Sequence, residues 1–120
     1  MTGGAAENAP GQGAPDAQRV SLLWATQVHA PAIARLHGEI FEAGWDEAAI
    51  TALLLHPASI ALVATDAHPM EIGGFVLAQI AADEAEILTL GTASTWRSRG
   101  VGTRLVDGVK RAAARSGGRA

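Results

Sequence analysis

The chain has 120 residues, of which 48% are hydrophobic and 4% aromatic, and its formal net charge is −3 at pH 7. This length corresponds to one small domain with a core built largely from Leu, Ile, Val and Ala. The sequence contains no cysteine, which excludes a disulfide framework and cysteine-ligated metals. No run reaches the roughly 18 apolar residues that a membrane-spanning helix needs, so we expect a cytoplasmic protein without a membrane partner.

Residues 1–19 differ in composition from residues 20–120. The first segment is mainly Gly, Ala, Pro and Gln without periodicity, and such a segment has few apolar side chains to bury. It also lacks the basic start and apolar middle of a signal peptide. We therefore predict a disordered tail over 1–19 and one folded domain over 20–120.

The folded part predicts elements in the order β-α-α-β-β-β-α, which indicates an α/β (α+β) fold. Pro31 suits the first turn of a helix, and Gly44 is expected to end that helix. Asp46 is a suitable N-cap for a second helix, which ends at His56-Pro57. The expected elements are a strand over 20–24, a helix over 31–41, a helix from 46 through 54, strands over 59–65, 74–80 and 85–90, and a helix from residue 100.

The turn before the last helix has the composition of an anion site. It reads RSRGVG over 97–102, between an apolar strand and an amphipathic helix. Unpaired N–H groups at a helix N-terminus and the helix dipole both favour negative charge. Gly100 and Gly102 leave room for a phosphate, and Arg97 and Arg99 add donors suited to phosphate oxygens. We interpret this turn as a diphosphate cradle.

Two other phosphate motifs do not fit this turn. A P-loop needs Gly, four residues and then Gly-Lys-Ser/Thr, which the sequence lacks. A dinucleotide-binding fingerprint needs a third glycine where Leu105 stands. Residues 1–96 hold eleven acids and two bases, whereas residues 97–120 hold seven bases and one acid, a distribution that attracts a polyanion to the second segment. Nucleic acid is disfavoured as that polyanion, because the basic stretch lacks interleaved aromatics and the rest of the domain is acidic.

The pattern Arg-x-x-Gly-x-Gly over 97–102 resembles the pyrophosphate-binding motif of the GNAT superfamily of acetyl-CoA-dependent N-acetyltransferases. Three further stretches resemble its RimI-like branch, which acetylates the N-terminal alanine of a small-subunit ribosomal protein: DEAEILTL over 83–90, GFVLA over 74–78 and FEAGWDEAAI over 41–50. The resemblance covers residues 21–119. It implies the N-terminal half of the GNAT fold, with a mixed, mostly antiparallel sheet flanked by helices.

The resemblance also implies that the chain binds acetyl-CoA as a cosubstrate and needs no metal. Leu90, Gly91 and Thr92 would bond the pantetheine amides through their backbone, as an added strand does. Family members usually have a small-hydrophobic pair such as Ala-Val where Gly91 and Thr92 stand, and proline where Ser94 stands. The residues that would hold the pyrophosphate are Arg97, Ser98, Arg99, Gly100, Val101, Gly102 and Thr103.

Catalytic groups do not transfer by this resemblance. In the family a tyrosine commonly protonates the departing thiolate, and this sequence has no tyrosine. In RimI-like enzymes the glutamate taken as base lies on the fifth strand, beyond Ala120. Glu84 and Glu86 are local substitutes, although solvent-facing carboxylates at a strand start are the better interpretation. We therefore assign no catalytic residue from the sequence.

The sequence stops at Ala120, where the family continues with a fifth strand, a fourth helix and a closing hairpin. We expect a domain that is incomplete at its C-terminus, in which the strand over 85–90 presents a bare edge that favours self-association. One hypothesis is transfer of acetyl from acetyl-CoA to an amine, with a ribosomal-protein N-terminal alanine as the favoured acceptor. The alternative is a non-catalytic GNAT half-domain that binds CoA weakly or assembles with another chain.

The histidines and tryptophans predict no second site. The histidines lack metal-ligand spacing, and surface or capping roles are expected for them. The tryptophans are interpreted as packing anchors, and the family's first-helix connection also makes Trp45 a candidate wall of the acceptor approach. The residues concerned are His29, His37, His56, His68, Trp24, Trp45 and Trp96.

Overall fold

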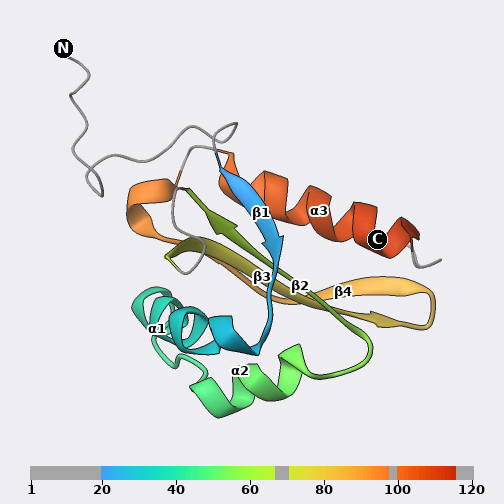
Figure 1. Cartoon of the computed structure of the whole chain (residues 1–120), viewed down its shortest axis with the longest axis horizontal. Helices are drawn as coiled ribbons and strands as arrows, with labels where there is room; N and C mark the ends of the chain where they lie inside the picture. The colour runs from blue at the N-terminus through green and yellow to red at the C-terminus, as the bar shows by residue number, and fades with distance from the viewer. Residues whose placement is uncertain (1–19, 67–70, 98–99, 116–120) are drawn as a thin grey trace.

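The computed structural model describes residues 20–66, 71–97 and 100–115. Within them, four antiparallel strands form one sheet in the order β1-β2-β3-β4. Helix α3 covers one face of this sheet, and α1 and α2 cover the other (Figure 1). The elements are β1 (Ser21–Trp24), a 3-10 helix η2 (Gln27–His29), α1 (Ala30–Ile40), α2 (Glu47–Leu54), β2 (Ser59–Thr65), β3 (Ile72–Ala81), β4 (Glu84–Thr92), a 3-10 helix η3 (Ser94–Trp96) and α3 (Val101–Arg115).

This order confirms the predicted β-α-α-β-β-β-α arrangement, and most boundaries agree within two residues. The predicted tail over 1–19 and parts of two predicted loops, residues 67–70 and 98–99, lie outside the described residues. None of the helices in the described ranges is long and apolar enough to cross a membrane.

The α1–α2 connection lies directly on the end of α1. Helix α1 ends at Ile40, because Phe41 adopts an extended conformation with ψ 138°, so the prediction that Gly44 ends this helix is wrong. Gly44 instead allows close approach, since a Cβ on it would lie 2.7 Å from the Cα of Gly38. Helix α2 then begins at its predicted N-cap, where Asp46 Oδ1 accepts the Ala49 N–H at 2.8 Å.

The β3–β4 hairpin contains a two-residue turn and a bulge. Ala82 and Asp83 both have positive φ, 51° and 75°, which matches the twist of the flanking strands. Along the ladder, Leu77 is opposite Thr89 and Ala78 is opposite Ile87, so Leu88 is an extra residue on β4. Such a bulge interrupts the ladder and redirects the strand, here four residues before the end of β4.

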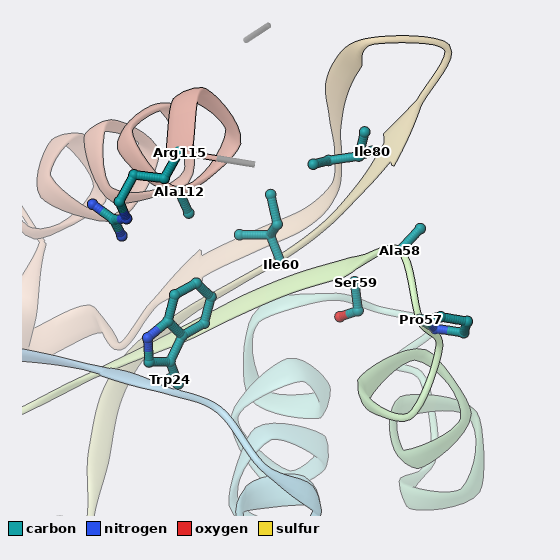
Figure 2. A pocket seen from close by; sticks show the side chains of 8 residues that line it. All are labelled: Trp24, Pro57, Ala58, Ser59, Ile60, Ile80, Ala112 and Arg115. Carbon is teal, nitrogen blue, oxygen red and sulfur yellow. The ribbon is translucent and has the colours of Figure 1, made fainter. Parts of the chain in front are cut away.

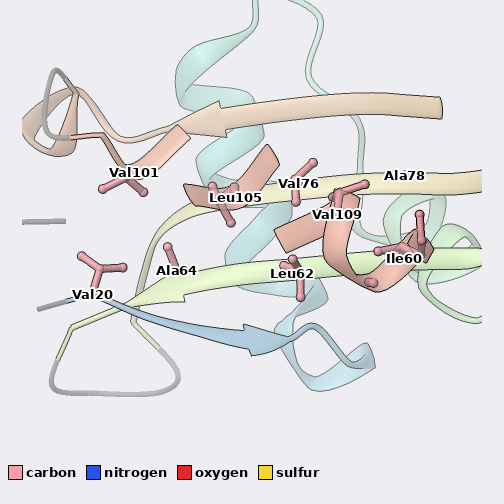
Figure 3. Close-up of a cluster of buried hydrophobic side chains, with 11 residues drawn as sticks. Val20, Ile60, Leu62, Ala64, Val76, Ala78, Val101, Leu105 and Val109 are labelled. Carbon is pink, nitrogen blue, oxygen red and sulfur yellow. The ribbon is translucent and has the colours of Figure 1, made fainter. Parts of the chain in front are cut away.

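The strands bury both faces, because α3 packs on one and α1 with α2 on the other. Alternate residues of β2 therefore enter different clusters, with Leu62 facing α3 and Val63 facing α1 and α2. The predicted stripe of α3 is confirmed, since Val101, Leu105, Val109 and Ala112 are all buried. Figure 3 shows the cluster under α3, which comprises Val20, Ile60, Leu62, Ala64, Val76, Ala78, Val101, Leu105, Val109, Ala112 and Ala113.

Candidate diphosphate-binding site

The end of β4, helix η3 and the first turn of α3 enclose a hollow of about 290 Å³. The sheet holds β4 beside β3, and the apolar stripe of α3 packs against β2, β3 and β4. Both sides of the hollow are therefore fixed by the core. Its lining residues are Thr92, Trp96, Arg97, Gly100, Val101, Gly102 and Thr103.

The backbone of α3 presents donors to this hollow. The first helical hydrogen bond runs from the Arg104 N–H to the Gly100 carbonyl at 3.1 Å. The N–H groups of Val101, Gly102 and Thr103 precede that bond, and a helix offers them no acceptor of its own. Because these three residues line the hollow, it is suited to bind an anion such as a phosphate.

The two glycines of the predicted cradle have different roles. Gly100 has φ 79°, in the left-handed region where a Cβ is strained, so it lets the chain turn into α3. Gly102 provides space instead. A Cβ built on it would have a single neighbour at 3.9 Å, Thr92 Oγ1, which also borders the hollow. The first glycine sets the backbone, and the second keeps the hollow open.

Arg97 and Trp96 form the outer wall. The Nε of Arg97 donates to the Thr92 carbonyl at 3.2 Å, which ties the loop back to the end of β4 and keeps the exposed guanidinium beside the hollow. The Trp96 ring packs so closely on Gly73 that a Cβ there would lie 2.1 Å from the ring. The packing role expected for Trp96 is confirmed, and the same ring lines the hollow.

The structure brings five of the seven predicted pyrophosphate residues together, and Ser98 and Arg99 lie outside the described residues. The residues predicted to bind the pantetheine are the last three of β4, and Gly91 among them pairs with Phe75 on β3. A Cβ on Gly91 would lie 2.7 Å from both Phe75 Cζ and Ile40 Cδ1. Packing of α1 against β3 and β4 therefore leaves no room for the alanine that the family usually has at this position.

Sequence reasoning missed a polar contact on the opposite face of the sheet. His37 was expected at the surface or in a cap, but only 3% of it is exposed. Its Nδ1 accepts the Trp45 N–H at 3.0 Å, and its Nε2 lies 3.1 Å from Thr89 Oγ1. Burial lowers the pKa of the imidazole below its ordinary value. The signal was present in the sequence, because His37 lies four residues after Ile33, on the buried side of α1.

The other candidate residues fall into simpler roles. His29 has the capping role that was one of the two expected for the histidines: it is buried, and its Nδ1 accepts the Thr26 N–H at 3.0 Å within a capping box. Glu84 and Glu86 are exposed at the start of β4, which agrees with their interpretation as solvent-facing carboxylates. Among the residues that the structure describes, no three His, Asp or Glu side chains gather as a metal site.

A second hollow, of about 340 Å³, lies near the C-terminal end of α3 and contains none of the predicted site residues (Figure 2). Its labelled side chains come from β1, β2, β3, α3 and the segment before β2. Trp24 is 55% exposed on this surface. The described residues of the predicted pyrophosphate site thus gather at the N-terminal end of α3, away from this surface.

Residues 30–120 match the model of the acetyltransferase (GNAT) family, and the chain therefore belongs to this family. This membership makes it an acetyltransferase by class. No curated protein sequence matches the chain.

Solved structures share the fold at low sequence identity. The fold is similar to that of Arabidopsis thaliana NAA60 in complex with acetyl-CoA, with TM-score 0.72, 18% identity, and coverage of 83% of this chain and 70% of that one. For the ribosomal-protein-S18-alanine N-acetyltransferase of Escherichia coli the TM-score is 0.71 at 14% identity, with coverage of 82% of this chain and 61% of that one. For an aminoglycoside acetyltransferase from an uncultured soil metagenomic sample the TM-score is 0.69 at 17% identity, with coverage of 85% of this chain and 74% of that one. The chain thus spans about three fifths to three quarters of these structures.

Proposed function

We propose that the chain transfers acetyl from acetyl-CoA to an amine, with the diphosphate held in the hollow at the N-terminus of α3. The observation that carries this proposal is that the first three residues of α3, the open space at Gly102 and Arg97 border the same hollow. The first N–H groups of a helix lack helical acceptors, so these residues supply donors there. A diphosphate requires this combination of donors, room and positive charge. Ser98 and Arg99 are included in the proposed site because they stand between Arg97 and Gly100 in the sequence.

The pantetheine arm is proposed to run along the end of β4, bonded by the backbone of Leu90, Gly91 and Thr92. Within the described sheet β4 is the last strand, so its outer edge is open to an extended ligand. The bulge at Leu88 supports this direction, because an extra residue releases backbone groups from the ladder near the place where the thioester would lie.

The reaction follows from the ligand. The acceptor amine loses a proton to a base or to water, and its nitrogen attacks the thioester carbonyl. The new C–N bond forms as the C–S bond breaks, and CoA leaves as the thiolate, which takes up a proton. An N–H released at the β4 bulge would stabilise the negative charge that develops on the carbonyl oxygen.

We propose a protein N-terminal alanine, as in a ribosomal protein, as the acceptor, in the cytoplasm. This choice is supported by the likeness to ribosomal-protein-alanine N-acetyltransferases from Escherichia coli and Brucella melitensis. Aminoglycoside acetyltransferases are also similar, so the test compares an Ala-starting peptide, a lysine peptide and an aminoglycoside by release of CoA thiol. Transfer to the first peptide alone supports the proposal, whereas a preference for either other acceptor overturns it.

Acetyl-CoA binding is tested by calorimetric titration of the parent, Gly100→Asp and Gly100→Asn. Asn and Asp tolerate positive φ better than other side chains, so both variants keep the turn at similar cost. Only Asp places a carboxylate against the diphosphate. Binding retained by the Asn variant and lost by the Asp variant supports the site, and equal affinities for the two variants contradict it.

One observation favours assembly with another chain as a second candidate function. The outer edge of β4 faces no strand within the described residues, and Ile87 on it is 40% exposed. An open edge of this kind can pair with a strand from another copy. Light scattering with the acetyl-transfer assay separates the two functions. A dimer that transfers no acetyl favours a non-catalytic module that binds CoA weakly, and an active monomer excludes it.

A further inference from the structure

His37 joins three parts of the structure that are distant in the sequence. It lies on α1, its Nδ1 accepts the backbone N–H of Trp45 in the α1–α2 connection, and its Nε2 contacts the hydroxyl of Thr89 on β4. The contact to Thr89 spans 52 residues. Three aromatic rings surround the imidazole, with centroids 4.4 Å away for Phe41, 5.0 Å for Trp45 and 5.7 Å for Phe75.

The hydrogen bonds define the protonation state of this imidazole. A backbone N–H is only a donor, so the Nδ1 of His37 must accept with a lone pair and carries no proton. The single proton of the neutral ring is then on Nε2, which donates to Thr89 Oγ1. A protonated ring would direct an N–H at the Trp45 N–H, and that hydrogen bond would be lost. Burial favours the neutral form, since it lowers the pKa of His37.

The connection that His37 holds has little burial of its own. Residues 41–49 are all exposed, and Trp45 is 36% exposed while its ring stacks on the imidazole at an interplanar angle of 20°. Trp45 also borders an apolar hollow of about 500 Å³ on α2, with Ala49, Ala52, Leu53 and His56. The bond to His37 therefore fixes a segment that faces solvent.

At the other end of the bridge, Thr89 follows the bulge residue Leu88 and precedes Gly91 by two positions. This is the part of β4 along which we propose that the pantetheine and thioester lie. A segment held to Thr89 through His37 is therefore held in register with the reacting end of the cosubstrate.

We propose that His37 is a positioning residue, which as the neutral Nε2–H form fixes the Trp45 connection to β4 and so sets the acceptor side of the site. The acceptor half of this inference rests on the proposed acetyl transfer. The structural half, a connection held by one buried imidazole, does not depend on it.

Acidification releases the bridge, because protonation of Nδ1 removes the acceptor of the Trp45 N–H. The aromatic and hydroxyl side chains that contact the ring come from the connection, β3 and β4, and they do not titrate near neutral pH. Strand β3 has no charged residue. The charged side chains of α1, the connection, α2 and β4 are exposed: Arg35, Glu39, Glu42, Asp46, Glu47, Glu84 and Glu86.

Two substitutions separate the ends of the bridge. In His37→Asn the side-chain oxygen takes the place of Nδ1 and can still accept the Trp45 N–H. In His37→Gln the amide nitrogen takes the place of Nε2 and can still donate to Thr89. Both variants lose the ring, so each is the control for the loss of packing in the other. His56→Gln is a further control, because His56 is exposed and accepts the Ala58 N–H at the far end of α2.

The readout is hydrogen exchange of the Trp45 amide, followed by NMR in the full chain. We expect the parent, His37→Asn and His56→Gln to protect this amide, and His37→Gln to exchange it roughly 3–10-fold faster, which is the effect of one lost hydrogen bond. Equal exchange in the parent and His37→Gln would overturn the proposal, as would equal loss of protection in the Asn and Gln variants.

Two further measurements test the proposal, and the first needs neither a folded variant nor acetyl transfer. In the parent, Trp45 protection should fall with decreasing pH together with titration of the His37 ring; protection that persists after the ring is protonated would contradict the bridge. In the transfer assay, His37→Gln should raise the KM for the acceptor and leave that for acetyl-CoA unchanged, and an equal rise in both refutes an acceptor-side role. Absence of transfer by the parent refutes the proposed function alone, since amide exchange still decides the role of His37.

Discussion

Gly102→Ala should have opposite effects on folding and on ligand binding. Gly102 lies in the first turn of α3, and a Cβ there meets only Thr92 Oγ1, at the ordinary contact distance of 3.9 Å. Replacing a helical glycine that has such space by alanine should raise the free energy of unfolding by about 0.5–1 kcal/mol. For a domain of this size, this gain raises Tm by roughly 2–8 °C.

The same methyl group would occupy the proposed position of a phosphate oxygen. It fills the space beside the Val101 and Gly102 N–H groups, so at least one hydrogen bond to the charged diphosphate should be lost. Such a bond contributes about 1.5–3 kcal/mol, which corresponds to a roughly 10–150-fold weaker affinity for acetyl-CoA. Stability and affinity should therefore change in opposite directions, which general damage to the fold would not produce.

Gly38→Ala is the matched control for this prediction. Gly38 is also helical, and a Cβ on it meets nothing within 4 Å, so this variant should gain similar stability and keep its affinity. The assays are thermal unfolding by circular dichroism and calorimetric titration with acetyl-CoA. If Gly102→Ala is stabilised and binds acetyl-CoA as tightly as Gly38→Ala does, the hollow is not a diphosphate site.

Three further predictions concern the surrounding structure. Gly91→Ala should lower the free energy of unfolding by about 1–3 kcal/mol in chemical denaturation, because its Cβ would overlap Phe75. The same substitution should cost less in a Phe75→Leu variant, and an equal cost there would contradict the explanation. Asp46→Ala should lower the free energy of unfolding by about 1 kcal/mol in the same measurement, since it removes the N-cap of α2. A decrease of less than a few tenths of a kcal/mol would refute this prediction. The pKa of His37 is lowered in the fold, so the unfolded chain binds a proton first as the pH falls below about 6.5. The free energy of unfolding should then decrease by up to about 1.4 kcal/mol per pH unit until the folded imidazole titrates. His37→Gln should reduce this slope, and an unchanged slope would contradict the explanation.

The elements that build the proposed diphosphate site could be predicted because their signals are local. The apolar strand before the turn, Gly100 at a helix start and the stripe of α3 each depend on residues a few positions apart. The structure adds what local patterns lack. Gly100 is required for its positive φ, whereas Gly102 is required for space. Both are glycines in the sequence, and only the backbone geometry separates the two reasons.

The proposed acceptor side could not be predicted in the same way. His37 contacts Thr89 across 52 residues, and nothing near either residue in the sequence identifies its partner. The bulge at Leu88 determines which residues of β4 face α1, and a single extra residue in a strand reverses the side on which later residues lie. Gly91 shows the same dependence, because the absence of a side chain there is explained by Phe75 and Ile40.

The two sides of the proposed site should therefore tolerate substitution differently. In the proposed site the diphosphate would be bound mainly by backbone N–H groups, whose positions depend on Gly100 and on packing of α3 against the sheet. On the proposed acceptor side, Trp45 lies in a short exposed connection and its N–H is bound by the His37 imidazole. A change at Trp45 can alter the acceptor without displacing the cradle, because the connection lies on the face of the sheet opposite α3.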